Sequence, residues 1–387
     1  MKDLKHLKTL LITENFPPKP GGSGRWFWEL YSRMPQGEYE ILAGTDTGAS
    51  TFDDSALLPI HRDNLTSSEW GFVSVKGLVF YITNAWRINR LIKTRKITAL
   101  HCGRVLPEGV IAWLLNILTS IPYTCYVHGE DLETAQSSRE QYFICGQVIK
   151  RAKNIICNSQ NSANIVAKFG EQAAAKTLVL HPGVDSDLFI PKNKDEATLS
   201  SLGWLNRKVV LTVGRLQARK GQDMMIKAIP AILKHIPNFL YAVVGDGERK
   251  EELVALVEKF KLEDYVQFFS EISDQDMINC YQQCDLFILP NRTIGQDIEG
   301  FGMVLVEAQS CAKPVIAGDS GGTIETMLPG ETGIVIDATE PQNIALGVVD
   351  MLADEQKLKE MGAKGREHVV KSLDWKALVL KAKQLFV

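Results

Sequence analysis

Short apolar runs that end in glycine, proline or a polar residue recur along the whole chain, and segments of helical periodicity separate them. Strands and helices in this alternation form a parallel sheet with helices on both faces. The predicted strands are residues 8–13, 39–42, 97–102, 123–127 and 154–159 in the first half, and residues 208–213, 240–244, 265–269, 286–289, 314–317 and 333–336 in the second.

The chain divides near its middle. At 387 residues it is too long for one ordinary domain. Pro182 and Gly183 break regular structure, and residues 192–196 are polar and linker-like. We therefore predict two Rossmann-like, doubly wound α/β domains, residues 1–188 and 189–371. Ligands collect at the carboxyl ends of parallel strands, so we expect the domains to face each other across a cleft that these ends line.

The composition argues against several classes of protein. A net charge of −3 speaks against nucleic acid as a main partner. Residues 1–8 are polar and basic, so we expect no signal peptide, and no apolar run reaches the roughly 18–20 residues of a membrane span. The seven cysteines include no Cys-x-x-Cys pair, so we expect reduced thiols and a cytoplasmic protein.

The stretch from Glu299 to Glu307 is a candidate ligand site. Gly300 and Gly302 allow a tight turn and a close approach of the backbone to a ligand, and residues 303–308 read as the start of a helix. Free N–H groups and the helix dipole at such a turn suit a phosphate. Carboxylates near that phosphate suit the hydroxyls of a nucleotide sugar. The alternative is an ordinary helix N-terminus with a surface glutamate.

A basic loop follows the predicted strand 208–213. It runs from Gly214 to Gly221 and carries Arg215, Arg219 and Lys220. Three cations at the carboxyl end of a strand favour a diphosphate, because Arg offers a fork of donors and Lys a point charge. The alternative is a solvated basic loop.

A second loop rich in glycine follows the first strand. Residues 14–24 contain three prolines and three glycines, and we expect Ser23, as N-cap, or Gly24 to begin a helix near residues 25–34. The pattern is not Gly-x-Gly-x-x-Gly, so it does not indicate a dinucleotide site. Its backbone N–H groups suit a diphosphate; a plain strand–helix turn is the alternative.

His128 ends the predicted strand 123–127 and is followed by Gly129. A histidine at a strand tip can donate to a sugar hydroxyl or a phosphate, although a structural histidine is the alternative. We expect Glu130 and Asp131 to face solvent or to cap a helix.

Residues 80–96 combine five Lys or Arg with apolar residues such as Phe80 and Trp86. Two interpretations are open: an amphipathic helix in contact with an anionic membrane, or an outer helix of the sheet with a solvated basic face.

The motifs together resemble the retaining GT-B glycosyltransferases of family four, almost end to end. The matching stretches are PGGSG, HGED, HPGVDSDLF, VGRLQARKGQD, VVGDGE, YQQCDLFILPN, EGFGMVLVEAQSCAKPVIA and SGGTIE. The loop RTIGQDIEGFG, with GRLQARKGQD and EAQ, looks most like the phosphatidylinositol mannoside mannosyltransferases, which use GDP-mannose. The resemblance also implies that a C-terminal helix, residues 372–387, crosses back to complete the first domain.

The resemblance implies roles for individual residues. Arg215 and Lys220 bind the donor diphosphate, Glu307 binds the ribose, Glu299 contacts the sugar, and His128 approaches the reaction centre. His128, Glu299, Arg215 and Lys220 are the residues expected to act in catalysis. The other implied donor-binding residues are Gly22 and Ser23 at the phosphates, Glu271 and Ile272 near the base, the backbone of Phe301, Gly302 and Met303 at the sugar, and Gly245 and Val304.

We therefore predict transfer of an α-hexosyl group, mannose from GDP-mannose, to a hydroxyl acceptor with retention at the anomeric carbon. The donor is the only small molecule required; no cofactor and no metal ion is expected. A UDP-sugar donor, or a non-catalytic scaffold that binds a sugar nucleotide, are the alternatives. The acceptor could be a lipid or a glycan, and the protein either free in the cytoplasm or peripheral on the inner face of the membrane. The sequence does not indicate the oligomeric state.

Overall fold

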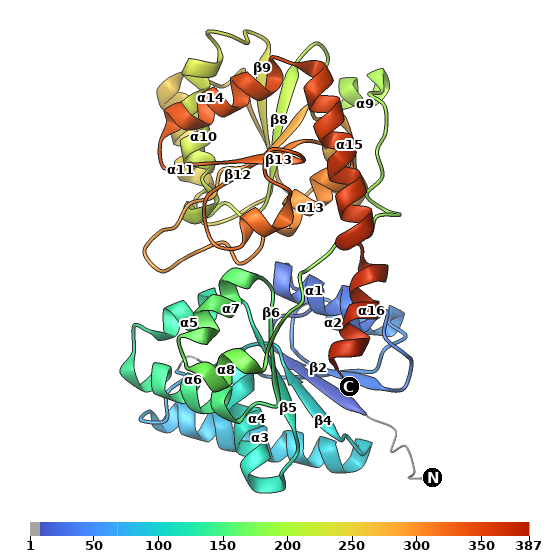
Figure 1. Ribbon diagram of the computed structural model, residues 1–387, viewed down its shortest axis with the longest axis vertical. Helices are drawn as coiled ribbons and strands as arrows, with labels where there is room; N and C mark the ends of the chain where they lie inside the picture. The colour runs from blue at the N-terminus through green and yellow to red at the C-terminus, as the bar shows by residue number, and fades with distance from the viewer. Residues whose placement is uncertain (1–7, 68, 387) are drawn as a thin grey trace. The chain divides into compact units, whose positions relative to one another are not determined.

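The computed structural model describes residues 8–67 and 69–386 (Figure 1). The described chain forms two compact units, a first that runs to His181 and includes the residues from Leu378 onward, and a second from Pro182 to Ala377. Residues 1–7, on which the expected absence of a signal peptide depends, and Val387, the end of the predicted last helix, lie outside the described residues. The domain limits at residues 188 and 371 remain predictions.

The first unit contains a seven-stranded sheet in which all neighbouring strands are parallel. The strand order β3-β2-β1-β4-β5-β6-β7 is doubly wound, because the chain moves outward from β1 in both directions. Its strands are β1 (Thr9–Thr13), β2 (Tyr39–Gly44), β3 (Ile60–Asp63), β4 (Ala99–Cys102), β5 (Tyr123–Val127), β6 (Asn154–Cys157) and β7 (Thr177–Val179).

The second unit contains a six-stranded parallel sheet of order β10-β9-β8-β11-β12-β13, again doubly wound. Side chains of its central strands alternate between two apolar cores, as the period of a strand requires. Val209 and Leu211 point into one core and Val210 into the other. Its strands are β8 (Lys208–Val213), β9 (Phe239–Val244), β10 (Val266–Phe269), β11 (Leu286–Leu289), β12 (Val315–Gly318) and β13 (Gly333–Ile336).

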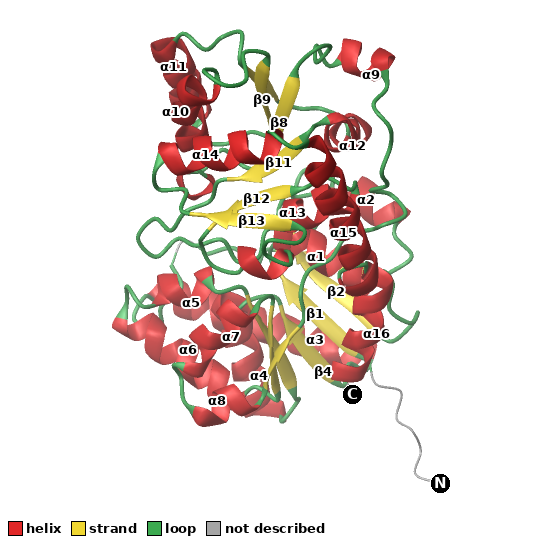
Figure 2. Ribbon diagram, turned by 45° about the horizontal axis from the view of Figure 1, so that its top comes forward, coloured by secondary structure: helices red, strands yellow, loops and turns green. Residues whose placement is uncertain are grey.

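Helices cover both faces of the first sheet. In Figures 1 and 2, α4 and α6 lie on one face, while α1 and α16 lie on the other. The helical segments are α1 (Gly22–Tyr31), α2 (Ala49–Ser55), α3 (Val75–Arg95), η1 (Val105–Gly109), α4 (Val110–Thr119), α5 (Glu130–Ala135), α6 (Arg139–Arg151), α7 (Gln160–Ala167) and α8 (Glu171–Ala175).

Helices also cover both faces of the second sheet. The core on one face includes residues of α10, α11 and α14, and the core on the other includes residues of α12 and α13. The helical segments are α9 (Glu196–Ser201), η2 (Ala218–Lys220), α10 (Gln222–Ile232), α11 (Lys250–Phe260), α12 (Asp274–Gln283), α13 (Met303–Ser310), η3 (Thr323–Thr326), α14 (Pro341–Leu352) and α15 (Glu355–Ser372). The last helix, α16 (Trp375–Leu385), is counted with the first unit from Leu378 onward.

The end of the chain returns to the first unit. Phe386 packs edge-on against His101, with ring centroids 4.7 Å apart, and stacks on Tyr31 at 6.2 Å. At the other end of this segment, Asp374 accepts a hydrogen bond from the backbone N–H of Ser186 within the second unit. The residues from Leu378 onward are therefore counted with the first unit, and that a helix over residues 372–387 completes the first domain stays a prediction.

The two doubly wound parallel sheets confirm the predicted fold class. Every predicted strand is present, whereas β3 and β7, whose residues are all only partly buried, were not predicted. The predicted helix start was wrong: α1 begins at Gly22 after Gly21, so Ser23 lies in its first turn and is not the N-cap. All seven cysteines are buried, and within the described residues no helix is both long and apolar enough to cross a membrane.

Close backbone contacts fix the loops at the carboxyl ends of the second sheet. Gly221 ends the basic loop after β8 with φ +76°, and a Cβ there would lie 1.8 Å from the carbonyl oxygen of Pro290, which follows β11. Only glycine satisfies both constraints. Gly330 has φ +82° but open space around it. Alanine at Gly330 would therefore meet the backbone strain of a positive φ without the steric clash that alanine would meet at Gly221.

We predict that Gly221→Ala destabilises the second unit more than Gly330→Ala does. Gly330→Ala should cost about 1–2 kcal/mol for the positive φ alone. Gly221→Ala should cost about 1–3 kcal/mol more, because the β8 and β11 loops must move apart. Urea unfolding of both variants measures this difference; equal losses would contradict the proposed close packing.

Candidate functional site

The candidate site in the second unit begins with an ion-pair cluster on loops that follow β8 and β11. Lys220 Nζ lies 2.5 Å from Glu299 Oε2, and Arg219 also donates to Glu299. Arg219 Nε lies 3.0 Å from Asp297 Oδ1. Two predicted site residues, Lys220 and Glu299, are thus in direct contact.

The two cations of this cluster lower the pKa of Glu299. Burial alone would raise the pKa of this carboxyl, but the charges of Lys220 and Arg219 and their hydrogen bonds outweigh burial and lower it. Glu299 therefore stays ionised between two cations. Arg219 was noted in the sequence as one of three cations but was not predicted as a site residue.

A second cluster supports the same loops. Arg292, in the loop after β11, forms two hydrogen bonds with Asp223 of α10, at 2.9 and 3.0 Å, and its backbone N–H donates to Arg219 O at 2.8 Å. Burial would raise the pKa of Asp223, but Arg292 lowers it. Sequence analysis missed this pair. The signal was available, since Arg292 follows the Pro290 that ends a predicted strand.

Glu307 lies within α13 and is almost fully buried. The hydroxyl of Tyr281 in α12 donates to Glu307 Oε2 at 2.6 Å and fixes its orientation. The helix begins after Gly302, whose φ is +96°, and no side chain caps its first N–H groups. Phe301 is buried beside this turn. The uncapped N–H groups at the start of α13 suit an anion, and a phosphate there stays a prediction.

The remaining predicted residues of the second unit differ in exposure. Arg215 is exposed in the loop after β8, and Glu271 is exposed with φ +56°. Gly245 follows β9 in a close packing, because a Cβ there would lie 2.2 Å from Gly214 O. The rest, all partly buried, are Ile272, Met303 and Val304.

In the first unit, His128 follows β5 and is mostly buried. Its Nε2 lies 2.9 Å from the carbonyl oxygen of Gly103, so Nε2 carries a proton and donates. In the neutral ring Nδ1 is then an acceptor, which suits a hydroxyl donor better than a phosphate. The backbone N–H groups of His128 and Gly129 donate to Asp131 at 3.3 and 3.1 Å. Gly22 and Ser23 lie in the first turn of α1.

A polar cluster beside this histidine was missed by the sequence analysis. Glu108 is fully buried; its Oε1 accepts from the N–H of Glu14 at 2.8 Å and from Arg104 at 3.2 Å. Arg104 also pairs with Glu14 at 3.2 Å. Glu108 reads as part of a helix in sequence, and only the fold places it at the strand ends.

Comparison with known proteins identifies the family. Residues 20–188 match the family model described as Glycosyltransferase Family 4, and residues 195–368 match the model described as Glycosyl transferases group 1. The chain belongs to the family-four glycosyltransferases. Glycosyl transfer, predicted from the motifs, is confirmed as its class of activity.

Two curated relatives are similar to this glycosyltransferase over nearly their full length. The GDP-mannose-dependent alpha-(1-6)-phosphatidylinositol monomannoside mannosyltransferase of Mycolicibacterium smegmatis is 29% identical over 380 residues, and 95% of each chain is covered. The GDP-mannose-dependent monoacylated alpha-(1-6)-phosphatidylinositol monomannoside mannosyltransferase of Corynebacterium glutamicum is 28% identical, with 96% of this chain and 95% of that one covered. The predicted resemblance to this group is confirmed.

Solved structures support the fold. Anabaena HepE in complex with UDP matches with a TM-score of 0.82 at 21% identity, covering 98% of this chain and 99% of that one. Sucrose-phosphate synthase of Thermosynechococcus elongatus matches with a TM-score of 0.80 at 20% identity, covering 98% of each.

Within residues 8–67 and 69–386, no group of three His, Cys, Asp or Glu side chains could hold a metal ion.

We predict that Glu299→Gln destabilises the glycosyltransferase by about 2 kcal/mol or more at pH 7, because Lys220 and Arg219 lose their buried counter-charge. The folded-state pKa of Glu299 lies below its ordinary value of 4.5. The carboxylate's contribution is therefore present above that value and is lost as pH falls. Calorimetric Tm values at pH 7 and pH 4 should show the gap between wild type and variant shrinking.

The exposed Glu331 provides the control for Glu299→Gln. Glu331→Gln should leave Tm unchanged at both pH values. A Glu299→Gln defect as large at pH 4 as at pH 7 would mean that the lost interaction is not the charge.

Proposed function

We propose that this glycosyltransferase transfers mannose from GDP-mannose to a hydroxyl acceptor, with retention at the anomeric carbon. The contact between Lys220 and Glu299, at 2.5 Å, carries the proposal. In a nucleotide sugar the sugar is bonded directly to the second phosphate. A cation for that phosphate and a carboxylate for the sugar hydroxyls must therefore be neighbours. The GDP-mannose dependence named for the two mannosyltransferase relatives supports mannose as the sugar and GDP as the nucleotide.

Donor binding would exchange partners within the ion-pair cluster. Lys220 and Arg219 pair with Glu299 in the structure. A diphosphate would take over both cations, with Arg215 from the same loop. Glu299 would then be available to accept hydrogen bonds from the sugar. The cations and the N-terminus of α13 would stabilise the charge that develops on the leaving diphosphate.

The other donor contacts follow the geometry of α13 and its neighbours. Glu307, held by Tyr281, would accept hydrogen bonds from the ribose hydroxyls. The backbone around Phe301 to Val304 would face the sugar and phosphates. We propose that the base binds near Gly245, Glu271 and Ile272.

The first unit would supply His128 and the loop of Gly22 and Ser23. His128 Nδ1, as the acceptor of the neutral ring, would take a hydrogen bond from a hydroxyl of the donor sugar. The backbone N–H groups of the first turn of α1 would contact the phosphates. We propose that the leaving phosphate itself removes the acceptor proton on the same face of the sugar, so that retention needs neither a second carboxylate nor a metal ion.

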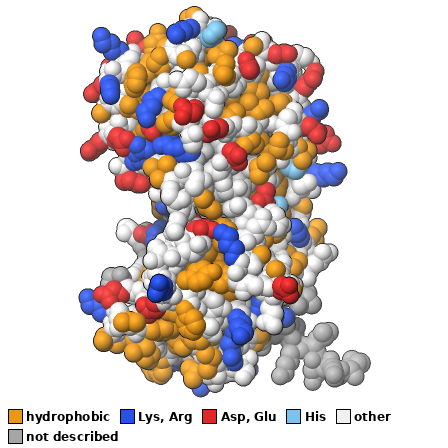
Figure 3. Space-filling view, turned by 60° about the vertical axis from the view of Figure 1, so that its left-hand side comes forward, with side chains coloured by type: hydrophobic (Ala, Val, Ile, Leu, Met, Phe, Trp, Pro, Cys, Tyr) orange, Lys and Arg blue, Asp and Glu red, His pale blue; other side chains and the backbone are white. Residues whose placement is uncertain are grey.

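The surface of the first unit supports peripheral contact with a membrane. The exposed apolar residues of α3 recur at the spacing of one helix face, and basic side chains flank them. Figure 3 shows a patch of hydrophobic side chains on this unit. The exposed apolar residues are Val75, Leu78, Val79, Ile82 and Trp86, and the exposed basic ones are Lys76, Arg87, Arg90, Lys93, Arg95 and Lys96. We propose that α3 lies on an anionic membrane, where a lipid-linked acceptor would be found.

We predict that calorimetry without metal detects GDP-mannose binding stronger than that of UDP-glucose. Glu307→Gln should weaken GDP-mannose at least about tenfold, since hydrogen bonds to a charged group contribute about 1.5–3 kcal/mol. Arg215→Ala should weaken GDP and GDP-mannose alike. Glu331→Gln is the matched control for Glu307→Gln. Preference for a UDP-sugar would overturn the mannose proposal, and an inverted product anomer by NMR would overturn retention.

We also predict that the protein sediments with vesicles containing anionic phospholipid. Ile82→Glu, on the apolar face of α3, should reduce this binding about tenfold or more, because it removes an aliphatic group that the membrane would bury and adds a charge that anionic lipid repels. Leu346 of α14, which is 63% exposed against 58% for Ile82, provides the control. Equal loss in Ile82→Glu and Leu346→Glu would exclude α3 as the contact.

A further inference from the structure

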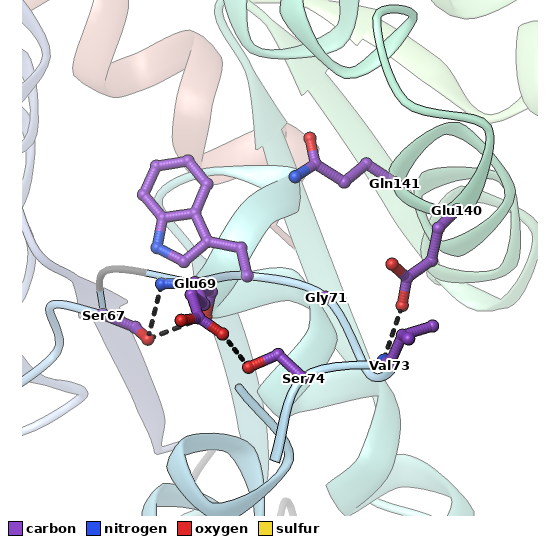
Figure 4. A pocket seen from close by; sticks show the side chains of 8 residues that line it. Ser67, Glu69, Gly71, Val73, Ser74, Glu140 and Gln141 are labelled. Carbon is purple, nitrogen blue, oxygen red and sulfur yellow. Dashed lines mark hydrogen bonds between the residues drawn. The ribbon is translucent and has the colours of Figure 1, made fainter. Parts of the chain in front are cut away.

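A cavity of about 630 Å³ opens in the first unit, between the loop before α3 and the first turn of α6 (Figure 4). Its volume is that of a small-molecule site. The donor-binding proposal uses none of its residues. Its lining residues are Ser67, Glu69, Trp70, Gly71, Val73, Ser74, Glu140 and Gln141.

The loop that forms the cavity is held in place by contacts at several points. Glu140 Oε1 accepts the backbone N–H groups of Phe72 and Val73, at 2.6 and 3.0 Å. The hydroxyl of Tyr81 donates to Trp70 O at 2.9 Å. A Cβ on Gly71 would lie 2.6 Å from Glu140 Oε2, so glycine makes room for this carboxylate. The site is therefore preorganised rather than a chance hollow.

The cavity connects to the strand ends of the same sheet. The guanidinium of Arg104 lies over the Trp70 ring, 6.0 Å from its centroid. Arg104 follows Gly103, whose carbonyl accepts the Nε2 proton of His128. The charge of Arg104 is already balanced by Glu14 and Glu108. Trp70 is thus fixed by a cation at the edge of the sheet where His128 lies.

The chemistry of the lining favours a neutral polyhydroxylated ring. Two carboxylates, Glu69 and Glu140, face the cavity, and its lining contains no cation, which disfavours a phosphate. Carboxylates accept hydrogen bonds from hydroxyls, and an indole offers an apolar face to the C–H side of a sugar ring. The indole N–H of Trp70 is buried and has no hydrogen-bond partner within the described residues, and the side chain of Gln141 adds an amide donor and acceptor to the lining.

We propose that this cavity binds the acceptor through a hexose or cyclitol ring, packed on Trp70 and hydrogen-bonded by Glu69, Glu140 and Gln141. The inference rests on the proposed function, since it assigns the acceptor's side of that reaction. Val73 lies at the cavity and is 87% exposed, immediately before the apolar face of α3. An amphiphilic acceptor could therefore place its ring in the cavity and its lipid part beside α3.

Saturation-transfer NMR on the full chain, with methyl α-D-mannopyranoside and myo-inositol as separate probes, tests the proposal. At least one probe should bind. Trp70→Ala should weaken it tenfold or more, while Trp70→Phe, which keeps an aromatic face, should retain most of the binding. Glu69→Gln and Gln141→Ala should each weaken it several-fold. Glu171→Gln, an exposed position on α8, is the matched control for Glu69→Gln and should not change it.

The outcomes separate this inference from the proposed function. GDP-mannose affinity, measured by calorimetry on the same variants, should stay unchanged within twofold. If the wild type binds a probe but not GDP-mannose, the proposed donor is overturned and the cavity proposal stands. Failure of both probes to bind, probe binding that is indifferent to Trp70→Ala, Glu69→Gln and Gln141→Ala, or displacement of the probes by inorganic phosphate would overturn the cavity proposal.

Discussion

The ion pairs between Glu299 and the two cations of the β8 loop are the interaction on which the second unit's site depends. They hold together two loops that are far apart in sequence. Lys220 and Arg219 on the first loop lie 79 and 80 residues before Glu299 on the second. A buried carboxylate needs such partners to remain charged. The same charges suit a diphosphate and a sugar, so the ligand-free protein is stabilised by groups that its donor would use.

This arrangement requires loops whose backbones approach closely. Gly221 meets Pro290 O, and a Cβ on Gly318 would lie 1.8 Å from the carbonyl oxygen of Asn291. Asn291 is fully buried and accepts the N–H of Gly318 at 3.2 Å. The loops after β8, β11 and β12 therefore form one packed layer at the carboxyl edge of the sheet. The backbone packing of this layer therefore holds Lys220 and Arg219 in position, in addition to their ion pairs with Glu299.

Most of the fold could be predicted because a buried parallel strand is a continuous apolar run, which can be recognised in the sequence without knowing which strands it pairs with. The half-buried strands β3 and β7 lack that signal. The motif residues Lys220 and Glu299 were predicted on local grounds, and their contact follows from the order of strands β8 and β11. Arg292 with Asp223 was missed because the pair joins segments whose proximity depends on strand order. Arg104 and Glu108 are only four residues apart, but their burial at the strand ends depends on the fold. The charge balance of Arg104 likewise depends on Glu14, 90 residues away.

The acceptor's side of the reaction is harder to predict from sequence for the same physical reason. Trp70 and Glu140 are 70 residues apart, and neither stands in a recognisable motif. Trp70 and Glu140 lie close together because the Glu140 carboxylate accepts backbone N–H groups of the loop that carries Trp70. A glycosyltransferase can therefore keep the ion-pair cluster of its donor site while this loop varies, because the loop's contacts all lie within the first unit. The ion-pair cluster and the acceptor loop would then be encoded on separate sheets, whereas His128 and the first turn of α1 would serve the donor from the same sheet as the acceptor loop.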